Sequence, residues 1–377
     1  MRDLEIRQWD ETAFLSNEKE WQTLLNSSDS NPLFLSWHWL KVWWSNYSDP
    51  STDRLSIFAV YQDDILVGLA PFYLTELFYI KGLIPVRRLQ FIGKRYKGKA
   101  GILSEYMNLI AKSHMENLVS SIVVKYIFSS KTWDELIVGD ISNNCVFHST
   151  LINEANRRKL RSRLLGSDNC FSIDTTNTFE NYLANLGKNT RLKLFNRRKV
   201  LDKHGDVSIE CRTLKSSDDI FDQINSFHKQ RFNSPIFDKQ SKSMIIEVDK
   251  VLSKDSNGKA YSSILKINNR TLSVIINLFV KGRIYNIQLG YIEHFDKKIS
   301  LGTLHLGYAI EMAFSSNEIS EFDLLAGGGK NSNYKEQIAS IHTTLESVQI
   351  INKPFIKFLY FINDRLKSHS LYKAWKL

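Results

Sequence analysis

The sequence predicts an α+β protein made of two tandem domains. Its 377 residues are more than one typical domain contains and are about right for two domains. The two halves also share one order of predicted elements: helices, a strand–turn–strand unit, another strand, a helix and a strand. Asp63-Asp64 occupies the turn in the first half and Asn268-Asn269 in the second. We therefore expect a structural duplication without a detectable sequence repeat.

The elements of the first half follow from hydrophobic periodicity. In the aromatic stretch Asn31 to Tyr47, the residues Trp37, Leu40, Trp44 and Tyr47 recur at helical spacing and predict a core-facing stripe. The predicted elements are, in order, a strand at 4–9, helices at 11–25 and 31–47, strands at 55–61, 65–74 and 87–92, a helix at 114–128, a strand at 133–138 and a helix at 142–160.

The second half starts again near Ser167. Its predicted elements are a strand at 170–174, a helix at 179–186, a basic segment at 188–203, a strand at 207–213, a helix opening at 216, a helix at 243–252, a strand from 262 to the turn at 268–269, strands at 271–279 and 283–291, a helix at 303–314 and a strand at 321–325. That last strand runs into a glycine-rich turn. A basic, aromatic segment, Pro354 to Leu377, is predicted to be helical.

Composition indicates a globular chain with anionic partners. Hydrophobic residues make up 43% of the chain and charged residues 24%, as in folded proteins. The formal net charge of +10 favours nucleotides, phosphorylated carriers, nucleic acid or an anionic membrane face, although a solubilising surface would give the same charge. The three cysteines show no metal-binding spacing, so a reduced compartment and no metal site are predicted.

No targeting or membrane-spanning segment is predicted. The N-terminal residues MRDLEIRQWD lack the apolar stretch of a signal peptide, and no uncharged apolar run is long enough to span a bilayer. The sequence also contains no nucleophile elbow, no zinc motif and no intact phosphate-binding glycine loop. A cytoplasmic location is expected.

Candidate site residues lie mainly in the second half. His228 and Arg231 are three apart and share one helix face, where a histidine can act as a base or an orienting donor. A single histidine on a partly apolar helix is, however, more often structural. Glu293 and Asp296 lie in the loop before Gly302, and either carboxylate could accept a proton from an amine; a solvated loop acid is the alternative.

The helix that begins near Gly302 and Thr303 is a candidate anion site, because the first N–H groups of a helix lack partners within it. A glycine that serves only the turn is the alternative. Beyond the last strand, which carries Asp323, lie Tyr334 and Lys335. A tyrosine hydroxyl can protonate a leaving thiolate, and a lysine can neutralise an anion.

The basic segment Lys188 to Lys203 contains seven Lys or Arg residues against Asp202 alone. Arg191, Arg197 and Arg198 within it are expected to contribute to a positive face near the interdomain cleft, with Arg191 and Arg197 binding substrate. A merely solvated surface is the alternative.

Several segments together resemble one family. These are NPLFLSWHWLKVWW, the strand ILVGLAPFYL, and FENYLANLGKNTRLKLFNRRKVLDKHG, followed by Phe227-His228 with Arg231, Gly302 with Glu293, and Tyr334-Lys335. In this order they resemble the CelD-like acetyltransferase family of the GNAT superfamily, named for cellulose biosynthesis and related to the Fem aminoacyltransferases. Glu293 stands where the family usually has aspartate, and Leu301 where proline is common.

The resemblance implies two tandem GNAT-like domains, each a mixed sheet flanked by helices, over residues 1–165 and 166–350, with a basic helical tail at 351–377. It also implies N-acyl transfer from acetyl-CoA or another acyl-CoA to the amine of a sugar, sugar-nucleotide or polysaccharide precursor. Glu293, His228, Tyr334 and Asp323 would be catalytic. The residues expected to bind substrate or cofactor are Arg231, Lys335, Gly302, Thr303, Arg191 and Arg197.

Two other functions stay open at this point. One is a Fem-like transfer from an aminoacyl-tRNA, which the net charge allows. The other is a non-catalytic binding protein of polysaccharide synthesis. The terminal helix, with Phe355, Phe358, Leu359 and Ile362 at helical spacing among basic residues, could also contact an anionic face of the inner membrane, although packing against the body of the protein is an alternative.

Overall fold

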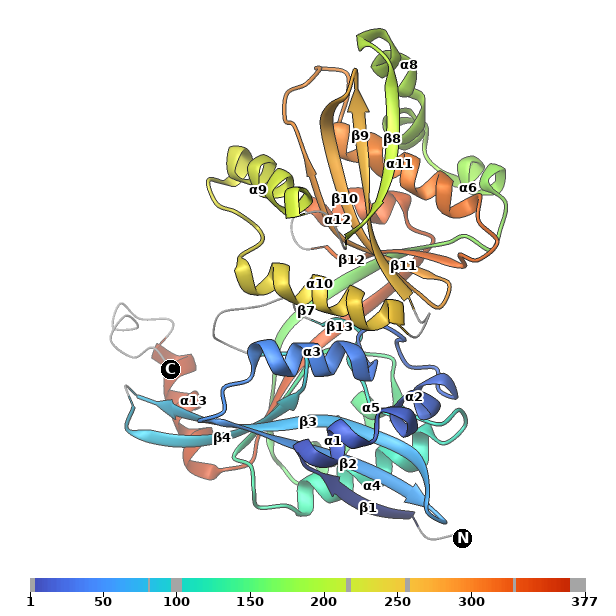
Figure 1. Ribbon diagram of the computed structural model, residues 1–377. Helices are drawn as coiled ribbons and strands as arrows, with labels where there is room; N and C mark the ends of the chain where they lie inside the picture. The colour runs from blue at the N-terminus through green and yellow to red at the C-terminus, as the bar shows by residue number, and fades with distance from the viewer. Residues whose placement is uncertain are drawn as a thin grey trace. The chain divides into compact units, whose positions relative to one another are not determined.

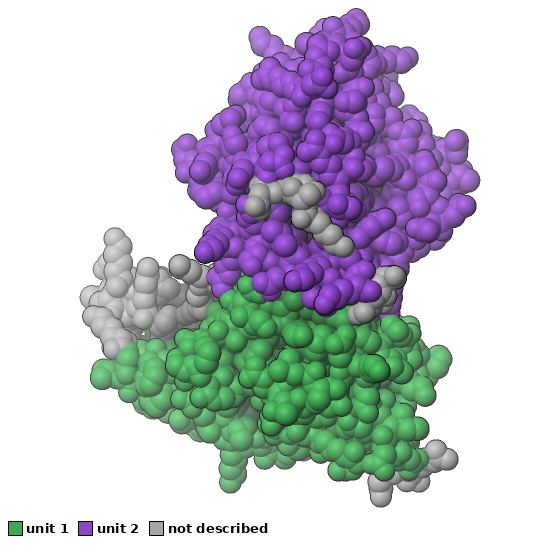
Figure 2. All heavy atoms as spheres, viewed as in Figure 1, with its two compact units in different colours: residues 1–168, 344–377 green, residues 169–343 purple. Residues whose placement is uncertain are grey.

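The computed structural model describes residues 4–80, 82–95, 104–214, 218–254, 258–327 and 330–366 (Figure 1). The chain divides into two compact units, shown in Figure 2. Unit 1 comprises 1–168 and 344–377, and unit 2 comprises 169–343. The described strands belong to one 13-stranded mixed sheet, which corrects the expectation of a separate sheet for each domain. Helices accompany the strands of both units, so the predicted α+β class is confirmed.

Unit 1 is built on the strand order β1-β2-β3-β4-β6-β13, in which only β4 and β6 pair in parallel. A short strand, β5, pairs with β3 outside this order. The bounds are β1 (Leu4–Trp9), β2 (Asp53–Gln62), β3 (Ile65–Tyr79), β4 (Ile84–Phe91), β5 (Ile110–Ala111), β6 (Glu135–Ser142) and β13 (Ile341–Ile351), the last of which begins in unit 2.

The helices of unit 1 are α1 (Glu11–Ser16), α2 (Glu18–Asn26), α3 (Trp37–Tyr47), α4 (Glu116–Ser129), α5 (Val146–Arg157) and α13 (Pro354–Leu366). They differ from the prediction chiefly at Asn17 and at the starts of α3 and α5, the latter predicted at 142 and observed at Val146. The single helix predicted at 11–25 breaks at Asn17, which leaves the helical conformation at ψ 33°. The helix predicted from Asn31 begins only at Trp37, because Ser36 Oγ accepts a hydrogen bond from Trp39 N at 3.1 Å and caps it there.

The aromatic face of α3 belongs to the core of unit 1, as predicted. Trp37, Leu40 and Trp44 are all at most 6% exposed. The indole of Trp39 is also buried and donates to Ser104 Oγ at 2.7 Å. These side chains therefore stabilise the unit and form no aromatic ligand box.

Unit 2 is built on the order β7-β12-β11-β10-β9-β8, in which only β11 and β12 pair in parallel. Its strands are β7 (Arg161–Asp174), which begins in unit 1, β8 (Val207–Thr213), β9 (Gly258–Ile267), β10 (Arg270–Val280), β11 (Arg283–Tyr291) and β12 (Glu321–Ala326). Its α-helices are α6 (Phe179–Asn185), α7 (Lys188–Arg191), α8 (Arg198–Leu201), α9 (Asp218–Phe232), α10 (Lys239–Lys254), α11 (Leu301–Phe314) and α12 (Lys330–Ile338).

The two predicted hairpin turns share one geometry. Asp63 and Asp64 have φ of 50° and 60°, and Asn268 and Asn269 have φ of 47° and 65°. Two residues with positive φ give the turn whose twist matches the flanking strands, and Asp and Asn tolerate that conformation. The flanking pairs, Gln62 with Ile65 and Ile267 with Arg270, close both hairpins.

A charged pair recurs at the parallel strand pair of each unit. Arg88 on β4 lies opposite Glu135 on β6, and Arg88 Nε donates to Glu135 Oε1 at 2.6 Å. Arg283 on β11 lies opposite Glu321 on β12, with Nη2 and Oε1 separated by 3.0 Å. In both units the strand that carries the arginine precedes the helix that connects the pair.

The C-terminal helix α13 packs on the hairpin formed by β3 and β4. Ile356, Leu359 and Tyr360 share a buried cluster with Tyr79 and Val86. Residues beyond 366, which were also predicted to be helical, lie outside the described part of the chain, as does residue 216, where the helix α9 was predicted to open.

Candidate functional site

The parallel strands of unit 2 separate after three residues. Arg283 to Tyr285 pair with Glu321 to Asp323, and within the described residues no strand pairs with that edge of β11 beyond Tyr285. Ile276 faces Gln288 while Asn277 faces Asn286, so Ile287 is an extra, bulged residue of β11. A bulge bends its strand. The unpaired backbone groups along this edge can hydrogen-bond an extended ligand.

The first turn of α11 presents backbone N–H groups close to Tyr291, the last residue of β11. Ser300 makes no side-chain cap, since its hydroxyl pairs with that of Thr303 at 3.0 Å. The first intrahelical bond runs from Leu304 N to Ser300 O. The N–H groups of Gly302 and Thr303 therefore have no partner within the helix. The helix begins at Leu301, two residues earlier than predicted.

Gly302 is required here by close contact with an aromatic ring. A Cβ at this position would lie 2.7 Å from Tyr291 Cε1, which is closer than two carbon atoms can approach. The ring of Tyr291 thus lies flat against the start of α11 only because residue 302 lacks a side chain. This contact joins the end of β11 to the candidate anion site.

Arg231 and Glu293 meet beside the same tyrosine. Arg231 Nε lies 2.8 Å from Glu293 Oε1, and Arg231 Nη1 donates to the Tyr291 hydroxyl at 2.8 Å. Both charged side chains are about one-third exposed, at 37% and 34%, so solvent can reach them. Sequence analysis proposed Arg231 and Glu293 but missed Tyr291, which accepts a second hydrogen bond from Arg231.

Tyr334, on α12, packs against the buried cluster that contains Phe322 and Leu324. Burial raises the pKa of its hydroxyl; the charge of Tyr291 raises that pKa further and that of Arg231 lowers it. Its hydroxyl stays protonated at neutral pH, because the ordinary tyrosine pKa is already about 10. It can therefore donate a proton or a hydrogen bond.

His228 lies on α9 one turn before Arg231, and its tautomer is fixed by its partner. Nδ1 lies 2.8 Å from the carbonyl oxygen of Ser234. A carbonyl only accepts hydrogen bonds, so Nδ1 carries a proton and Nε2 of the neutral ring is left as an acceptor. The ring also contacts Phe232, with centroids 4.6 Å apart.

Asp323 and Lys335 hold the end of β12. Asp323 is fully buried and accepts from Arg283 Nη2 at 2.6 Å and from Leu325 N at 2.7 Å. Lys335 Nζ donates to the carbonyl oxygens of Leu324, at 2.6 Å, and of Ala326, at 2.7 Å. These contacts give both side chains a positioning role at the point where β12 leaves β11. A direct chemical role for either stays a prediction.

Arg191, Arg197 and Arg198 lie on the basic segment, where Arg198 pairs with Glu311 and lies over the ring of Tyr308. Arg191 Nη1 donates to the carbonyl oxygen of Leu183 at 3.2 Å and so fixes α6. Arg197 forms no ion pair among the described residues. The segment itself contains a π-helical turn, Leu192–Asn196, against which α11 packs directly: a Cβ at Gly307 would lie 2.0 Å from the Leu194 carbonyl oxygen.

A buried histidine that sequence analysis missed lies within α11. His305 Nε2 is 2.9 Å from Ser263 Oγ, and His305 Nδ1 is 2.9 Å from Ser273 Oγ. Ser273 Oγ donates to the Gly290 carbonyl oxygen at 3.1 Å, so it accepts from Nδ1–H, and Nε2 accepts from Ser263. Burial lowers the pKa of His305 to about 3. This neutral ring ties α11 to β9 and β10.

His305 should make unit 2 sensitive to acid. The unfolded state binds a proton near the ordinary pKa of 6.5, and the folded state only near 3, so stability is lost as the pH falls through this window. The free energy of unfolding can fall by at most about 1.4 kcal/mol per pH unit from this one group, which is at most about 2 kcal/mol between pH 6.5 and 5. Urea unfolding at several pH values should show a steeper loss in the native protein than in His305→Gln, and equal slopes would contradict the assignment.

Metal ligands and membrane spans were also sought. Among the described residues, no three His, Cys, Asp or Glu side chains are grouped as they would be around a metal ion. No helix in the described ranges is long and apolar enough to cross a membrane.

Comparison with known proteins defines the class. Residues 188–336, less than half of the chain, match the family model described as an acetyltransferase (GNAT) domain. These residues contain α9, β11, α11, β12 and most of α12, and hence the whole cluster around Tyr291. Unit 2 carries a GNAT domain, and the protein is an acyltransferase of the GNAT type.

Two solved structures resemble the chain over nearly its whole length. The crystal structure of FemX has a TM-score of 0.61 at 10% identity, over 91% of this chain and 98% of that one. A conserved protein of unknown function from Bacteroides thetaiotaomicron VPI-5482 has a TM-score of 0.54 at 9% identity, over 92% and 100%. At such identities the likeness concerns the fold, here across both units. No curated protein sequence matches significantly.

Proposed function

We propose that the protein transfers an acyl group from acetyl-CoA or another acyl-CoA to the amine of a sugar, sugar-nucleotide or polysaccharide precursor. The pathway proposed is cell-envelope or exopolysaccharide biosynthesis, as in the CelD-like family that the sequence resembles. The observation that carries the proposal is the separation of β11 from β12 beside the uncapped start of α11. An extended chain that ends in phosphates has complementary partners at both places.

The residues fit an acyl-CoA by the chemistry of their donor groups. The open edge of β11 would hydrogen-bond the amide-containing arm, and the N–H groups of Gly302 and Thr303 would bind the pyrophosphate. The bound acyl-CoA supplies an activated thioester. All other groups required for the transfer come from the protein.

Glu293 is proposed to remove a proton from the acceptor ammonium. Its Oε1 is held by Arg231 Nε at 2.8 Å, which leaves Oε2 to accept that proton directly or through a water molecule. Arg231 keeps the carboxylate in place and remains charged throughout. His228 Nε2, an acceptor one helical turn away, would orient the substrate.

Tyr334 is proposed to donate to the departing sulfur. A thiolate leaves when the carbon–sulfur bond breaks, and a protonated hydroxyl nearby stabilises it. The raised pKa of Tyr334 keeps that proton available at neutral pH. The free amine has meanwhile attacked the acyl carbon, so the products are an amide and a thiol.

Calorimetric titration with acetyl-CoA tests the donor. Saturable binding is expected, and Gly302→Ala should weaken it at least about tenfold, because the new Cβ would displace the Tyr291 ring from the start of α11. Gly166→Ala is a matched control, since a Cβ there meets no atom within 4 Å. No binding to the native protein would remove acyl-CoA as the donor.

A Fem-like transfer from aminoacyl-tRNA is the second candidate. It is favoured by the exposed lysines of the basic segment, Lys188, Lys193, Lys199 and Lys203. A tRNA complex whose affinity falls steeply with rising salt concentration would support it. The affinity should be lower still in a Lys193→Glu, Lys199→Glu double variant. Binding of acetyl-CoA without binding of tRNA would leave only the first candidate.

Peripheral membrane contact is proposed for the surface of α13 and the β3–β4 hairpin. Five large apolar side chains are exposed by 43% or more on these two packed elements: Phe78, Leu83, Phe355, Phe358 and Phe361. Exposed Lys353, Lys357 and Arg365 lie among them on α13 or just before it. Figure 1 shows α13 beside β4. Aromatic side chains flanked by cations suit an anionic bilayer surface.

Replacing Phe355, Phe358 and Phe361 together by serine is expected to reduce sedimentation with phosphatidylglycerol vesicles at least about fivefold. The buried face of α13, with Ile356 and Leu359, stays intact. Leu118→Ser, at a residue 50% exposed elsewhere in unit 1, is the matched control. Equal sedimentation of all three proteins would exclude this surface as the contact.

A further inference from the structure

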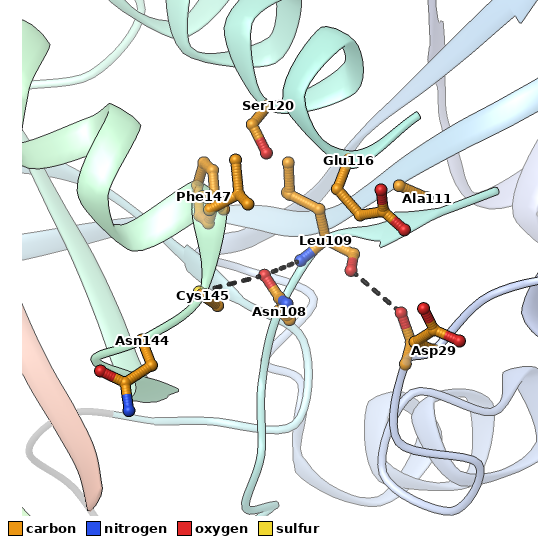
Figure 3. Close-up of a pocket in the computed structure, with 11 residues that line it drawn as sticks. Asp29, Asn108, Leu109, Ala111, Glu116, Ser120, Asn144, Cys145 and Phe147 are labelled. Carbon is orange, nitrogen blue, oxygen red and sulfur yellow. Dashed lines mark hydrogen bonds between the residues drawn. The ribbon is translucent and has the colours of Figure 1, made fainter. Parts of the chain in front are cut away.

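A cavity of about 260 Å³ lies in unit 1 between the first turns of α4 and α5 (Figure 3). The segment that contains Asn108 and Leu109 forms one side, and Asp29 lies at another. Leu109 and Phe147 give it an apolar surface. Binding sites for drug-sized ligands are usually somewhat larger, so this one suits a single ring or a short chain.

Ser120 places an unsatisfied hydroxyl in this cavity. Its side chain is only 3% exposed, it forms no hydrogen bond within the described part of the protein, and Figure 3 shows it directed into the cavity. Its oxygen is not among the fully enclosed unpaired polar atoms of the described residues, so it is open to the cavity and available to hydrogen-bond a ligand. The Nδ2 group of Asn108 likewise has no partner among the described residues, because only its Oδ1 is engaged, by Leu109 N at 2.8 Å and by Cys145 Sγ at 3.7 Å.

The charged groups of the cavity are both acidic. Asp29 and Glu116 line it, and no Lys, Arg or His residue does, although the chain as a whole carries a net charge of +10. Glu116 Oε1 accepts from His114 N at 3.1 Å, which leaves Oε2 for a ligand. Figure 3 shows both carboxylates at the same side of the cavity. The cavity therefore selects against anions and favours a cation.

One side of this cavity, the first turn of α4, corresponds in topology to the first turn of α11, where the pyrophosphate is proposed to bind in unit 2. Helix α4 connects the parallel strands β4 and β6, just as α11 connects β11 and β12. The first turn of α11 contains Gly302, whereas the first turn of α4 begins with Glu116. A carboxylate there repels a pyrophosphate and occupies the positive end of the helix dipole itself. The two equivalent places thus have opposite charge preferences.

We propose that this cavity binds a small organic ammonium ion that carries hydroxyl groups, of the size of an amino sugar. Glu116 and Asp29 pair with the ammonium group. Ser120 and Asn108 hydrogen-bond the hydroxyl groups, and the apolar face of the ring lies on Leu109 and Phe147. Burial raises the pKa of the Cys145 thiol, so that residue is a poor nucleophile and the site binds its ligand without covalent chemistry.

Calorimetric titration of the full chain with glucosamine tests this site, with glucose as the neutral probe of the same ring. Glucosamine is expected to bind at least tenfold more tightly than glucose. Glu116→Gln keeps the acceptor oxygen for His114 N but removes the charge, and should weaken glucosamine binding about tenfold. Ser120→Ala should weaken it severalfold. Glu76→Gln, at an exposed carboxylate outside the cavity, should leave it unchanged.

Thermal melting of each variant verifies that it is folded before it is titrated. No heat with glucosamine, equal binding of glucosamine and glucose, or an unchanged affinity in Glu116→Gln would each overturn the proposal. These results are independent of acetyl-CoA binding, which concerns unit 2. Failure of one site therefore leaves the other testable.

Discussion

Replacement of Glu293 by glutamine is expected to lower turnover by roughly two orders of magnitude or more while the fold stays intact. The glutamine amide oxygen can still accept from Arg231 Nε, now 2.8 Å from Glu293 Oε1, so the local contact is retained. An amide cannot accept a proton from an ammonium group at neutral pH. The loss should therefore fall on the chemical step, with little change in the affinity for acetyl-CoA.

Thiol release from acetyl-CoA in the presence of an accepted amine measures this effect. Asp296→Asn is the matched control, because Asp296 lies in the same loop but pairs with His204 at 2.9 Å instead of Arg231. Its turnover should change only slightly. If both variants lose activity equally, the loop matters for its conformation and Glu293 is not the base.

Arg88→Met should destabilise unit 1 by about 3–5 kcal/mol. Arg88 and Glu135 are 1% and 0% exposed in their side chains, so methionine would leave a carboxylate buried without its countercharge. Tyr79 donates to the same carboxylate at 2.7 Å and Gln349 donates to it at 2.6 Å. Neither supplies a positive charge, so they cannot replace the arginine.

Urea unfolding followed by a spectroscopic signal of unit 1 measures this loss. The adjacent residue offers the control: Arg87 is 41% exposed, and its partner Asp134, although only 6% exposed, also has Lys353 Nζ 3.7 Å away. Arg87→Met leaves Asp134 that second cation and should therefore cost clearly less than Arg88→Met. A similar loss in both variants would mean that the enclosed network around Glu135 adds nothing beyond a pair whose arginine is exposed.

Local sequence patterns were sufficient for most strands and for the hairpins. Strands β8 and β11 have the predicted bounds, and the turns at Asp63-Asp64 and Asn268-Asn269 form as expected, because turn residues and alternation act over a few neighbours. The predicted start of α3 was wrong, and the cause is again an interaction between near neighbours in the sequence. Asn31 Oδ1 accepts from Phe34 N at 2.9 Å, which forms a separate turn before the helix.

The site was less accessible from sequence, because its central contacts join distant elements. Tyr291 is the last residue of a strand, and nothing in its neighbourhood in the sequence shows that Arg231 and Gly302 come to it from two helices. The bulge at Ile287 depends on the register with β10, which no periodicity reveals. His305 lies in a strongly apolar helix, and its serine partners lie on two strands of the sheet.

The recurring arginine–glutamate pair has a consequence for how the two halves can change. In unit 1 the Tyr360 hydroxyl of α13 donates a hydrogen bond to Glu135 Oε2 at 3.0 Å. The pair therefore connects the sheet to the C-terminal helix. In unit 2 the corresponding Arg283 is shared with Asp323, at the point where the strands part for the proposed donor. A mutation at Arg88 should therefore lower the amount of folded protein. A mutation at Arg283 should instead lower the activity while the amount of folded protein stays the same. The same kind of charged pair thus stabilises the fold of unit 1, and in unit 2 it lies where it would shape the candidate site.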